Sequence, residues 1–217
     1  SYFAEALDKK GRCDVITSNP AQALWSGIVE PEKARLVVDR IFDKDMFSGW
    51  GIRTLSSKEK RYNPLGYHNG TIWPHDNSLI AMGLSRYGFK EEMSGLFTCM
   101  YEAAGFYPIY RLPELFGGYQ RVEYDVPIKY PVACSPQAWS AGTMPYMLSA
   151  SLGLIPDALN MRLTLNKPKL PPWLHTVKIS KLIVGDAYTQ LEFRREGDST
   201  LVNVVGKRVD LEVRVVY

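Results

Sequence analysis

Prolines open the apolar segments in the first two thirds of the chain. Pro20, Pro31, Pro74 and Pro136 each stand at the start of a run whose apolar residues recur at a helical spacing of three or four. Proline suits the first position of a helix, because its φ is already fixed and no hydrogen-bond donor is lost there. With a further apolar repeat over 89–104, the sequence predicts five helices.

These segments are of two kinds. Those that begin near residues 20, 74 and 136 are apolar or small on all sides and almost uncharged, whereas those near 31 and 89 carry one apolar stripe and charges opposite it. This alternation is typical of an inner ring of helices covered by an outer ring. We therefore expect a mainly α domain over residues 1–156.

From Pro156 onwards the apolar period changes from helical to alternating. Alternating runs lie at 177–184, 188–194, 200–205 and 209–217, separated by the turn signals Gly185-Asp186 and Glu196-Gly197-Asp198. The sequence therefore predicts a small antiparallel β unit over residues 157–217.

Composition excludes several classes of function. The net charge of +3 is small and its charges are mixed, so nothing indicates nucleic-acid binding. No apolar stretch approaches the ~20 residues of a membrane span, and the N-terminal residues do not resemble a signal peptide. The chain lacks an initiator Met and is expected to be a piece of a longer protein. Its three cysteines have no metal-type spacing, so we expect free, buried thiols and a cytoplasmic location.

A first long connection, residues 43–71, leads into the apolar helix at Pro74. Its last part and the first helical turn concentrate Tyr67, His68, Trp73 and Asp76. Backbone N–H groups at a helix start favour oxygen-rich ligands. Each residue also has an ordinary interpretation, as core tryptophan, buried histidine or capping aspartate. Capping needs one polar residue and not a cluster, so the group as a whole indicates a binding site.

A metal centre is the less favoured interpretation of this cluster. His68 and His75 are seven residues apart, and no third histidine is nearby. We therefore expect no metal and no cofactor.

A second long connection, residues 106–134, carries one carboxylate in an apolar, glycine-rich setting. Glu114 in Leu112-Pro-Glu-Leu-Phe-Gly-Gly118 is a candidate general base, although Arg111 could pair with it in a plain salt bridge. Trp139 adds an indole near the start of the next helix. Nucleophile-elbow, dinucleotide and P-loop motifs are absent, and carboxylates, aromatics and amides dominate, as in sites that handle sugars.

These residues carry a family resemblance. Over about residues 5–153 the chain resembles the C-terminal region of bacterial glycogen-debranching, amylo-α-1,6-glucosidase-type proteins, a group of six-hairpin glycosidases. The matching segments, in the same order, are 6–8, 17–19, 24–27, 47–55, 67–77, 112–116 and 135–139. Those at 67–77 and 47–55 are the most specific.

The resemblance implies a partial (α/α)6 barrel and an inverting glycoside hydrolase with two carboxylates about 6.5–9.5 Å apart. The family's general base maps onto Glu114, and its acid, an Asp, lies ahead of Ser1. The implied substrate is an α-glucan or oligosaccharide, with α-1,6 branch points of glycogen-like glucans as the linkage. The residues implied to line the sugar pocket are Arg53, Tyr67, His68, Trp73, Asp76 and Trp139.

The parent protein is thus expected to be a glycoside hydrolase of carbohydrate metabolism, while this chain alone is expected to be inactive. One carboxylate cannot supply both proton transfers, and five helices fall short of the twelve of a complete barrel. Exposed inner helices would favour self-association. Two alternatives stay open: a carbohydrate-binding or scaffold module that has lost its chemistry, and a hydrolase of another α-glycoside, such as trehalose or mannosylglycerate.

Overall fold

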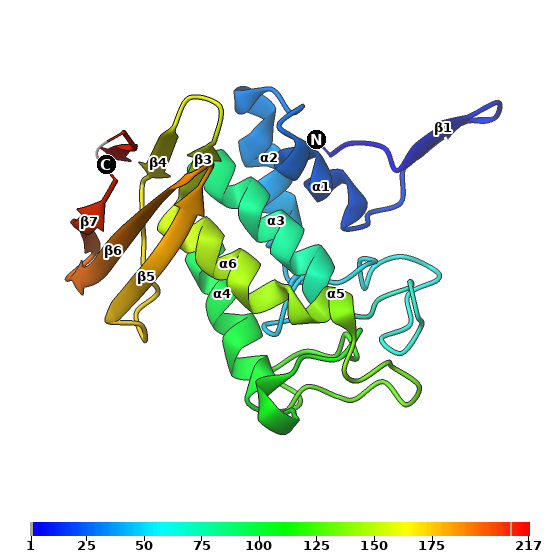
Figure 1. The fold of residues 1–217 in the computed structure, drawn as a ribbon. Helices are drawn as coiled ribbons and strands as arrows, with labels where there is room; N and C mark the ends of the chain where they lie inside the picture. The colour runs from blue at the N-terminus through cyan, green and yellow to red at the C-terminus, as the bar shows by residue number, and fades with distance from the viewer. Residues whose placement is uncertain (1, 209) are drawn as a thin grey trace. The chain divides into compact units, whose positions relative to one another are not determined.

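The computed structural model describes residues 2–208 and 210–217. The chain divides into two compact units, Ser1–Met147 and Leu148–Tyr217. Helices and strands are both well represented in the described residues, with six α-helices and eight β-strands (Figure 1). None of the described helices is both long and apolar enough to cross a membrane.

The prediction of a mainly α fold with a partial (α/α)6 barrel is wrong. Strands form at both ends of the chain, and the described helices form no evident α/α barrel. The physical reason is that long loops and alternating segments occupy much of the chain where paired helices would be needed. The helices are α1 (Asn19–Ser26), α2 (Pro31–Ile41), α3 (Pro74–Arg86), α4 (Lys90–Ala104), α5 (Ala138–Ala141) and α6 (Thr143–Leu152), with a 3-10 turn at Pro108–Tyr110.

The predicted helix starts at Pro20, Pro31 and Pro74 are confirmed. The last helix differs from the prediction, because it begins at Ala138 and is interrupted at Gly142. Gln137 caps it by accepting a hydrogen bond from the Ser140 N–H at 2.9 Å. The glutamine amide therefore caps a helix that starts two residues after Pro136.

Helix α3 is the centre of the first unit. It packs against α1 and α4 (Figure 1), and nine of its thirteen residues are buried, as its small and apolar composition predicted. The contact with α1 is close at Gly83. A Cβ added there would lie 2.7 Å from the Leu24 Cβ and 2.7 Å from the Trp25 backbone nitrogen.

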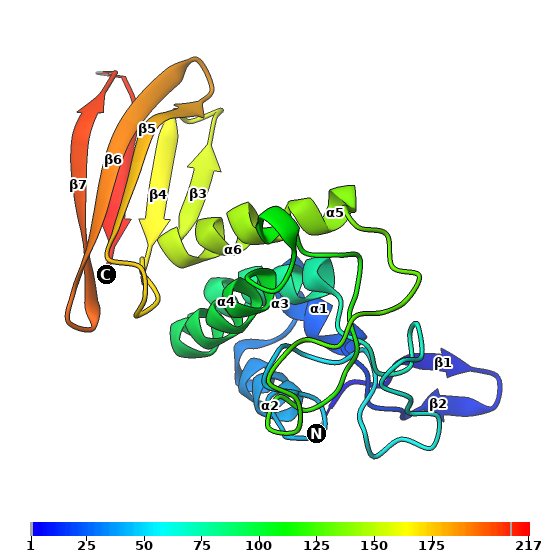
Figure 2. The same ribbon diagram turned by 90° about the horizontal axis from the view of Figure 1, so that it is seen from below.

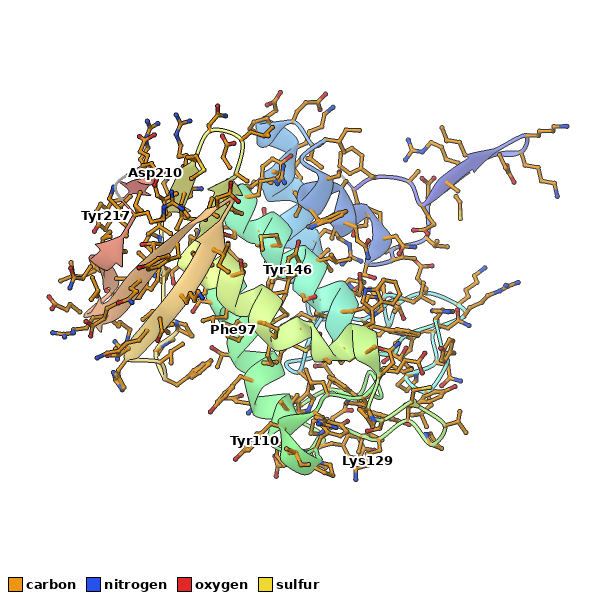
Figure 3. All side chains as sticks on the ribbon, in the orientation of Figure 1. Phe97, Tyr110, Lys129, Tyr146, Asp210 and Tyr217 are labelled. Carbon is orange, nitrogen blue, oxygen red and sulfur yellow. The ribbon has the colours of Figure 1, made fainter. Side chains whose placement is uncertain are left out.

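The two long loops are joined at the N-terminal end of α3, where their side chains crowd together (Figure 3). Short bridges connect Thr17 with Leu55, Arg53 with Ile72, Ile72 with Phe116, and Phe116 with Lys129. Glycine makes the closest approach possible. A Cβ added to Gly118 would lie 1.7 Å from the Gly70 carbonyl oxygen, so only glycine fits there.

A short hairpin precedes α1. Strands β1 (Ala6–Asp8) and β2 (Gly11–Cys13) pair antiparallel, with Ala6 opposite Cys13. All six strand residues are exposed, and the ribbon extends from the first unit (Figures 1 and 2).

The second unit contains two three-stranded sheets (Figure 2). One has the order β3 (Leu154–Asp157), β4 (Arg162–Asn166), β8 (Glu212–Val216), and the other β5 (Thr176–Val184), β6 (Ala187–Glu196), β7 (Ser199–Lys207). The predicted turns at Gly185 and Gly197 are confirmed, both with positive φ. Strand β8 pairs parallel to β4, which an antiparallel unit did not anticipate. Both sheets contribute to one core, with Leu163 and Leu165 from β4 and Leu191 and Phe193 from β6.

The approach of α1 to α3 leads to a stability prediction. We expect Gly83→Ala to lower the free energy of unfolding by about 1–3 kcal/mol, because the new methyl group meets the α1 backbone and must displace it. Urea unfolding of the chain measures the change.

Gly95 in α4 is the matched control, since a Cβ added there meets nothing within 4 Å. Gly95→Ala should be neutral or stabilise the chain by about 0.5–1 kcal/mol through helix propensity. Equal midpoints for the two variants would contradict the close packing of α1 on α3.

Candidate active site

Glu114 is held in place by two partners from different parts of the first unit. Its Oε1 accepts a hydrogen bond from the Tyr67 hydroxyl, and its Oε2 accepts one from the Cys134 N–H at 3.3 Å. The Glu114 N–H in turn donates to the Cys134 carbonyl at 2.9 Å. Arg111 is exposed and forms no ion pair with Glu114 within residues 2–208 and 210–217, so the salt-bridge alternative is not seen.

Tyr67 remains a donor throughout the neutral range. The hydrogen bond to Glu114 raises the pKa of Tyr67 to about 12, with burial and the Glu114 charge acting in the same direction. A phenol with this pKa keeps its proton at neutral pH. The hydroxyl therefore continues to orient the Glu114 carboxylate.

Aromatic rings continue from Tyr67 into the first turn of α3. Tyr67 lies edge-on to Trp73 at 4.9 Å and tilted to Tyr130 at 5.9 Å between ring centroids. His68 stacks on Trp73 at 5.0 Å with 13° between the planes. The Trp73 Nε1–H donates to the Tyr67 carbonyl at 3.0 Å, which fixes the indole.

The row ends at an exposed tryptophan. Trp73 meets His75 edge-on at 5.5 Å, and His75 stacks on Trp139 at 3.9 Å with only 8° between the planes. Trp73 is 6% exposed, whereas Trp139 is 63% exposed. We call Tyr130, Tyr67, His68, Trp73, His75 and Trp139 the aromatic row. Such a row, with a carboxylate at one end and an open indole at the other, suits a ligand with apolar faces and polar edges.

His75 is a neutral member of this row at pH 7. Burial lowers the pKa of His75, although the charges of Asp76 and Glu114 act in the opposite direction. Its Nδ1 is buried and has no hydrogen-bond partner within the described part of the chain. The neutral ring can therefore stack closely on Trp139 without bringing a buried positive charge into the row.

Asp76 follows His75 in the first turn of α3 and is held by side chains at the start of α1. Its Oδ2 accepts a hydrogen bond from the Ser18 hydroxyl at 2.6 Å, and its Oδ1 accepts one from the Gln22 amide. Burial raises the pKa of Asp76, while these two hydrogen bonds act against the increase. Asp76 was predicted to line the pocket, but the structure places its oxygens on protein donors, with 5% of the residue exposed.

Arg53 is also occupied by protein groups. Its Nε donates to the Gly118 carbonyl at 2.6 Å, and one terminal nitrogen donates to the carbonyls of Lys44 and Asp45, each at 3.2 Å. The residue is 1% exposed, and this burial lowers the pKa of its guanidinium. Arg53 thus joins the two loops instead of facing the open end of the aromatic row.

Within residues 2–208 and 210–217, no three His, Cys, Asp or Glu side chains come together in a way that could hold a metal ion. The three cysteines are free, as expected. Cys13 and Cys134 are exposed, so the expectation of buried thiols is wrong for these two.

The structure therefore divides the candidate residues into two groups. One group is connected through the Tyr67 hydrogen bond and the ring of His75, and consists of Glu114, Tyr67, His68, Trp73 and Trp139. The other group, Arg53 and Asp76, bonds to protein groups that hold the loops and α3. The sequence interpretation missed His75, weighed only as a zinc ligand, and Tyr130 and Cys134. The position of His75 directly after Trp73-Pro74 was the available signal.

Residues 2–107, a little under half of the chain, match the family model of a mannosylglycerate hydrolase MGH1-like glycoside hydrolase domain. This match supports a glycoside hydrolase of six-hairpin glycosidase type and does not support the glycogen-debranching subfamily specifically. No curated protein matches the chain.

Solved structures from Thermus thermophilus are similar to part of this chain. An uncharacterized conserved protein aligns with a TM-score of 0.51 at 16% identity, over 63% of this chain and 31% of its own. A GH63 mannosylglycerate hydrolase in complex with glucose aligns at 0.47 and 20% identity, over 63% and 32%. The same enzyme with Tris aligns at 0.46 and 19% identity, over 63% and 30%. The aligned part thus spans about a third of the length of these structures, and the first of them supports a shared fold only.

The stacking of His75 on Trp139 leads to a titration experiment. We expect His75 to titrate below its ordinary pKa of 6.5, and Trp139→Ala to raise this pKa towards 6.5, because removing the indole admits water to one face of the ring. Ring-proton NMR resolves the residue, since the chain has only three histidines.

Trp25→Ala is the control. Trp25 is also partly exposed, but it bonds the Tyr146 hydroxyl at 2.7 Å and should leave the pKa of His75 unchanged. A His75 pKa at or above 6.5 in the unmodified chain would rule out the neutral stacked ring.

Proposed function

We propose that this chain supplies the general-base side of the active site of an inverting glycoside hydrolase that cleaves α-glucosidic linkages. The observation that carries the proposal is the hydrogen bond from Tyr67 to Glu114 beside the aromatic row. It supplies an oriented carboxylate at one end of a sugar-sized aromatic wall. The match of residues 2–107 to a glycoside hydrolase domain also supports it.

In the proposed reaction Glu114 takes a proton from water. Oε1 already accepts the hydrogen bond of the Tyr67 hydroxyl, while Oε2 has only the longer 3.3 Å contact with the Cys134 N–H. Oε2 is therefore the oxygen that we expect to take the proton of the water. The water oxygen bonds to the anomeric carbon as the glycosidic C–O bond breaks. A carboxylic acid on the other face protonates the leaving oxygen, and the anomeric configuration inverts.

The general acid is proposed to lie outside residues 1–217, as the family resemblance implies. It would need to be about 6.5–9.5 Å from Glu114 to leave room for the water. Catalysis is therefore to be tested in the complete protein that carries this chain.

The aromatic row is proposed as the wall that binds the sugar. Trp139 presents an open indole face, and the exposed His68 stands beside Tyr67, at 4.6 Å between the ring centroids. Trp73, which is buried, and His75, which is partly exposed, support these two residues. We propose Arg53 and Asp76 as positioning residues, which hold the loops and α3 and do not contact the sugar.

The linkage is proposed to be an α-1,6 branch point of a glycogen-like glucan, as the motif resemblance implies. A second candidate is an α-glycoside of a hydroxy acid, which the mannosylglycerate-hydrolase-like family match favours. Initial rates on isomaltose, panose and mannosylglycerate distinguish the two. A binding or scaffold module would cleave none of them.

Replacing the proposed base tests catalysis directly. We expect Glu114→Gln in the complete protein to reduce kcat about 10²–10⁴-fold, because the amide cannot accept the proton of water. Sugar affinity should change less than about threefold, since Gln keeps the size of the side chain and most of its hydrogen bonds. Stopped assays measure kcat, and calorimetry measures sugar affinity. With the unmodified protein, NMR of the first-formed sugar should show the inverted anomer.

Glu123→Gln is the matched control, since Glu123 is exposed on the same loop and has no assigned role. Its kcat should stay that of the unmodified protein. Retained turnover in Glu114→Gln, or a retained anomeric configuration, would exclude Glu114 as an inverting base.

Tyr67→Phe tests the orientation of the base. Loss of the hydroxyl leaves Oε1 without its donor, and we expect kcat to fall about 10-fold or more while KM changes little. Tyr110→Phe is the control, because Tyr110 is exposed in the 3-10 turn Pro108–Tyr110 of the second loop (Figure 3). A KM effect with kcat unchanged would instead make Tyr67 a simple sugar contact.

A further inference from the structure

His68 also lines a large cavity that the proposed reaction does not use. The cavity has a volume of about 860 Å³ and lies entirely within the first unit, between the segment before α1 and the loop around residues 54–69. This volume falls within the ~300–1,000 Å³ of typical small-molecule sites.

One wall of the cavity is fixed by hydrogen bonds. The Glu5 carboxylate accepts hydrogen bonds from the Thr17 hydroxyl and the Asn19 amide. The Glu59 carboxylate accepts one from the Ile16 N–H at 3.0 Å. Two carboxylates are therefore already oriented by protein donors, as in a preformed polar site.

The formal charges around the cavity cancel. Lys60 and Arg61 line it together with Glu5 and Glu59, and the amide of Asn69 is exposed beside them. A strongly charged ligand would meet a like charge on one wall, whereas a neutral polyhydroxyl ligand would find donors and acceptors in every direction. The chemistry of the lining favours a sugar unit over an organic acid.

The cavity adjoins the proposed base through one residue. His68 lines the cavity, stacks on Trp73 at 5.0 Å and lies 4.6 Å from the ring of Tyr67, which bonds Glu114. A chain of sugars that starts beside Glu114 and passes His68 would therefore enter this cavity.

We propose that the cavity around Glu5, Glu59, Lys60, Arg61, His68 and Asn69 binds a second, neutral sugar unit of the substrate. The inference rests on the proposed function and deepens it, because it makes the substrate an oligosaccharide and not a glycoside of a charged acid. No covalent step takes place in the cavity.

Binding to this chain tests the proposal without requiring turnover. Glucose is a single unit and probes the aromatic row beside Glu114. Isomaltotriose is long enough to reach the cavity as well. We expect isomaltotriose to bind at least about 10-fold more tightly than glucose, as measured by calorimetry. Asn69→Ala should remove about 3–10-fold of the isomaltotriose affinity and leave glucose unchanged, since one neutral hydrogen bond contributes about that much.

Asn203→Ala is the matched control. Asn203 is exposed and lines a smaller cavity of about 270 Å³ over β6 and β7 in the second unit. The affinities for both sugars should remain those of the unmodified chain. Urea unfolding of both variants shows whether the exposed Asn69 side chain is dispensable for folding, as its position indicates.

The outcomes separate the two proposals. Trp139→Ala should weaken glucose and isomaltotriose alike, and its failure to do so, or the absence of glucose binding, counts against the proposed function. Glucose binding with no advantage for isomaltotriose, or an advantage that Asn69→Ala leaves intact, overturns the second sugar position alone. Tighter binding of mannosylglycerate than isomaltotriose, weakened by Lys60→Gln, would also overturn it, by making the cavity an anion site.

Discussion

The buried guanidinium of Arg53 holds together the two loops on which the site depends. It donates to carbonyls of Lys44 and Asp45 on the first loop and to Gly118 on the second. The Tyr62 hydroxyl donates to the same Gly118 carbonyl at 3.0 Å. Because Glu114 and Tyr67 belong to different loops, their hydrogen bond depends on the loops being held together here and at the Ile72–Phe116 bridge. A buried cation with carbonyl partners is costly to disturb, which gives the junction its rigidity.

Most candidate site residues of the first unit lie in its two long loops or in the first turn of a helix, and the packed helices position them. Helix α3 starts between the two loops and is buried on most of its surface. In its first turn, Asp76 accepts hydrogen bonds from Ser18 and Gln22, and the adjacent His75 stacks on Trp139. The anchoring of Asp76 therefore helps to hold the helical turn that carries His75. Such division between a packed scaffold and functional loops is common in enzymes.

Local features could be read from the sequence more reliably than their assembly. Proline positions predicted the starts of α1, α2 and α3, and glycine turns predicted the hairpins of the second unit. The fold class was wrong, because helical periodicity in some segments says nothing about how much loop lies between them. The protein partners of Asp76 and Arg53 could not be predicted either, since a motif cannot show whether a polar side chain faces a ligand or a protein group. The parallel pairing of β4 with β8 joins residues about 50 positions apart and leaves no local signal.

Tyr67 connects the two tasks of the proposed site. Its hydroxyl holds Glu114, its ring contacts Trp73, and its carbonyl accepts the Trp73 Nε1–H. A sugar that presses on the aromatic row therefore acts on the same residue that orients the base. Because His68 lies between Tyr67 and the large cavity, occupation of that cavity would reach the base through the same two rings. In the proposed reaction, sugar binding and proton transfer would therefore be coupled through Tyr67, and we expect a longer substrate to improve the alignment of Glu114 as well as the affinity.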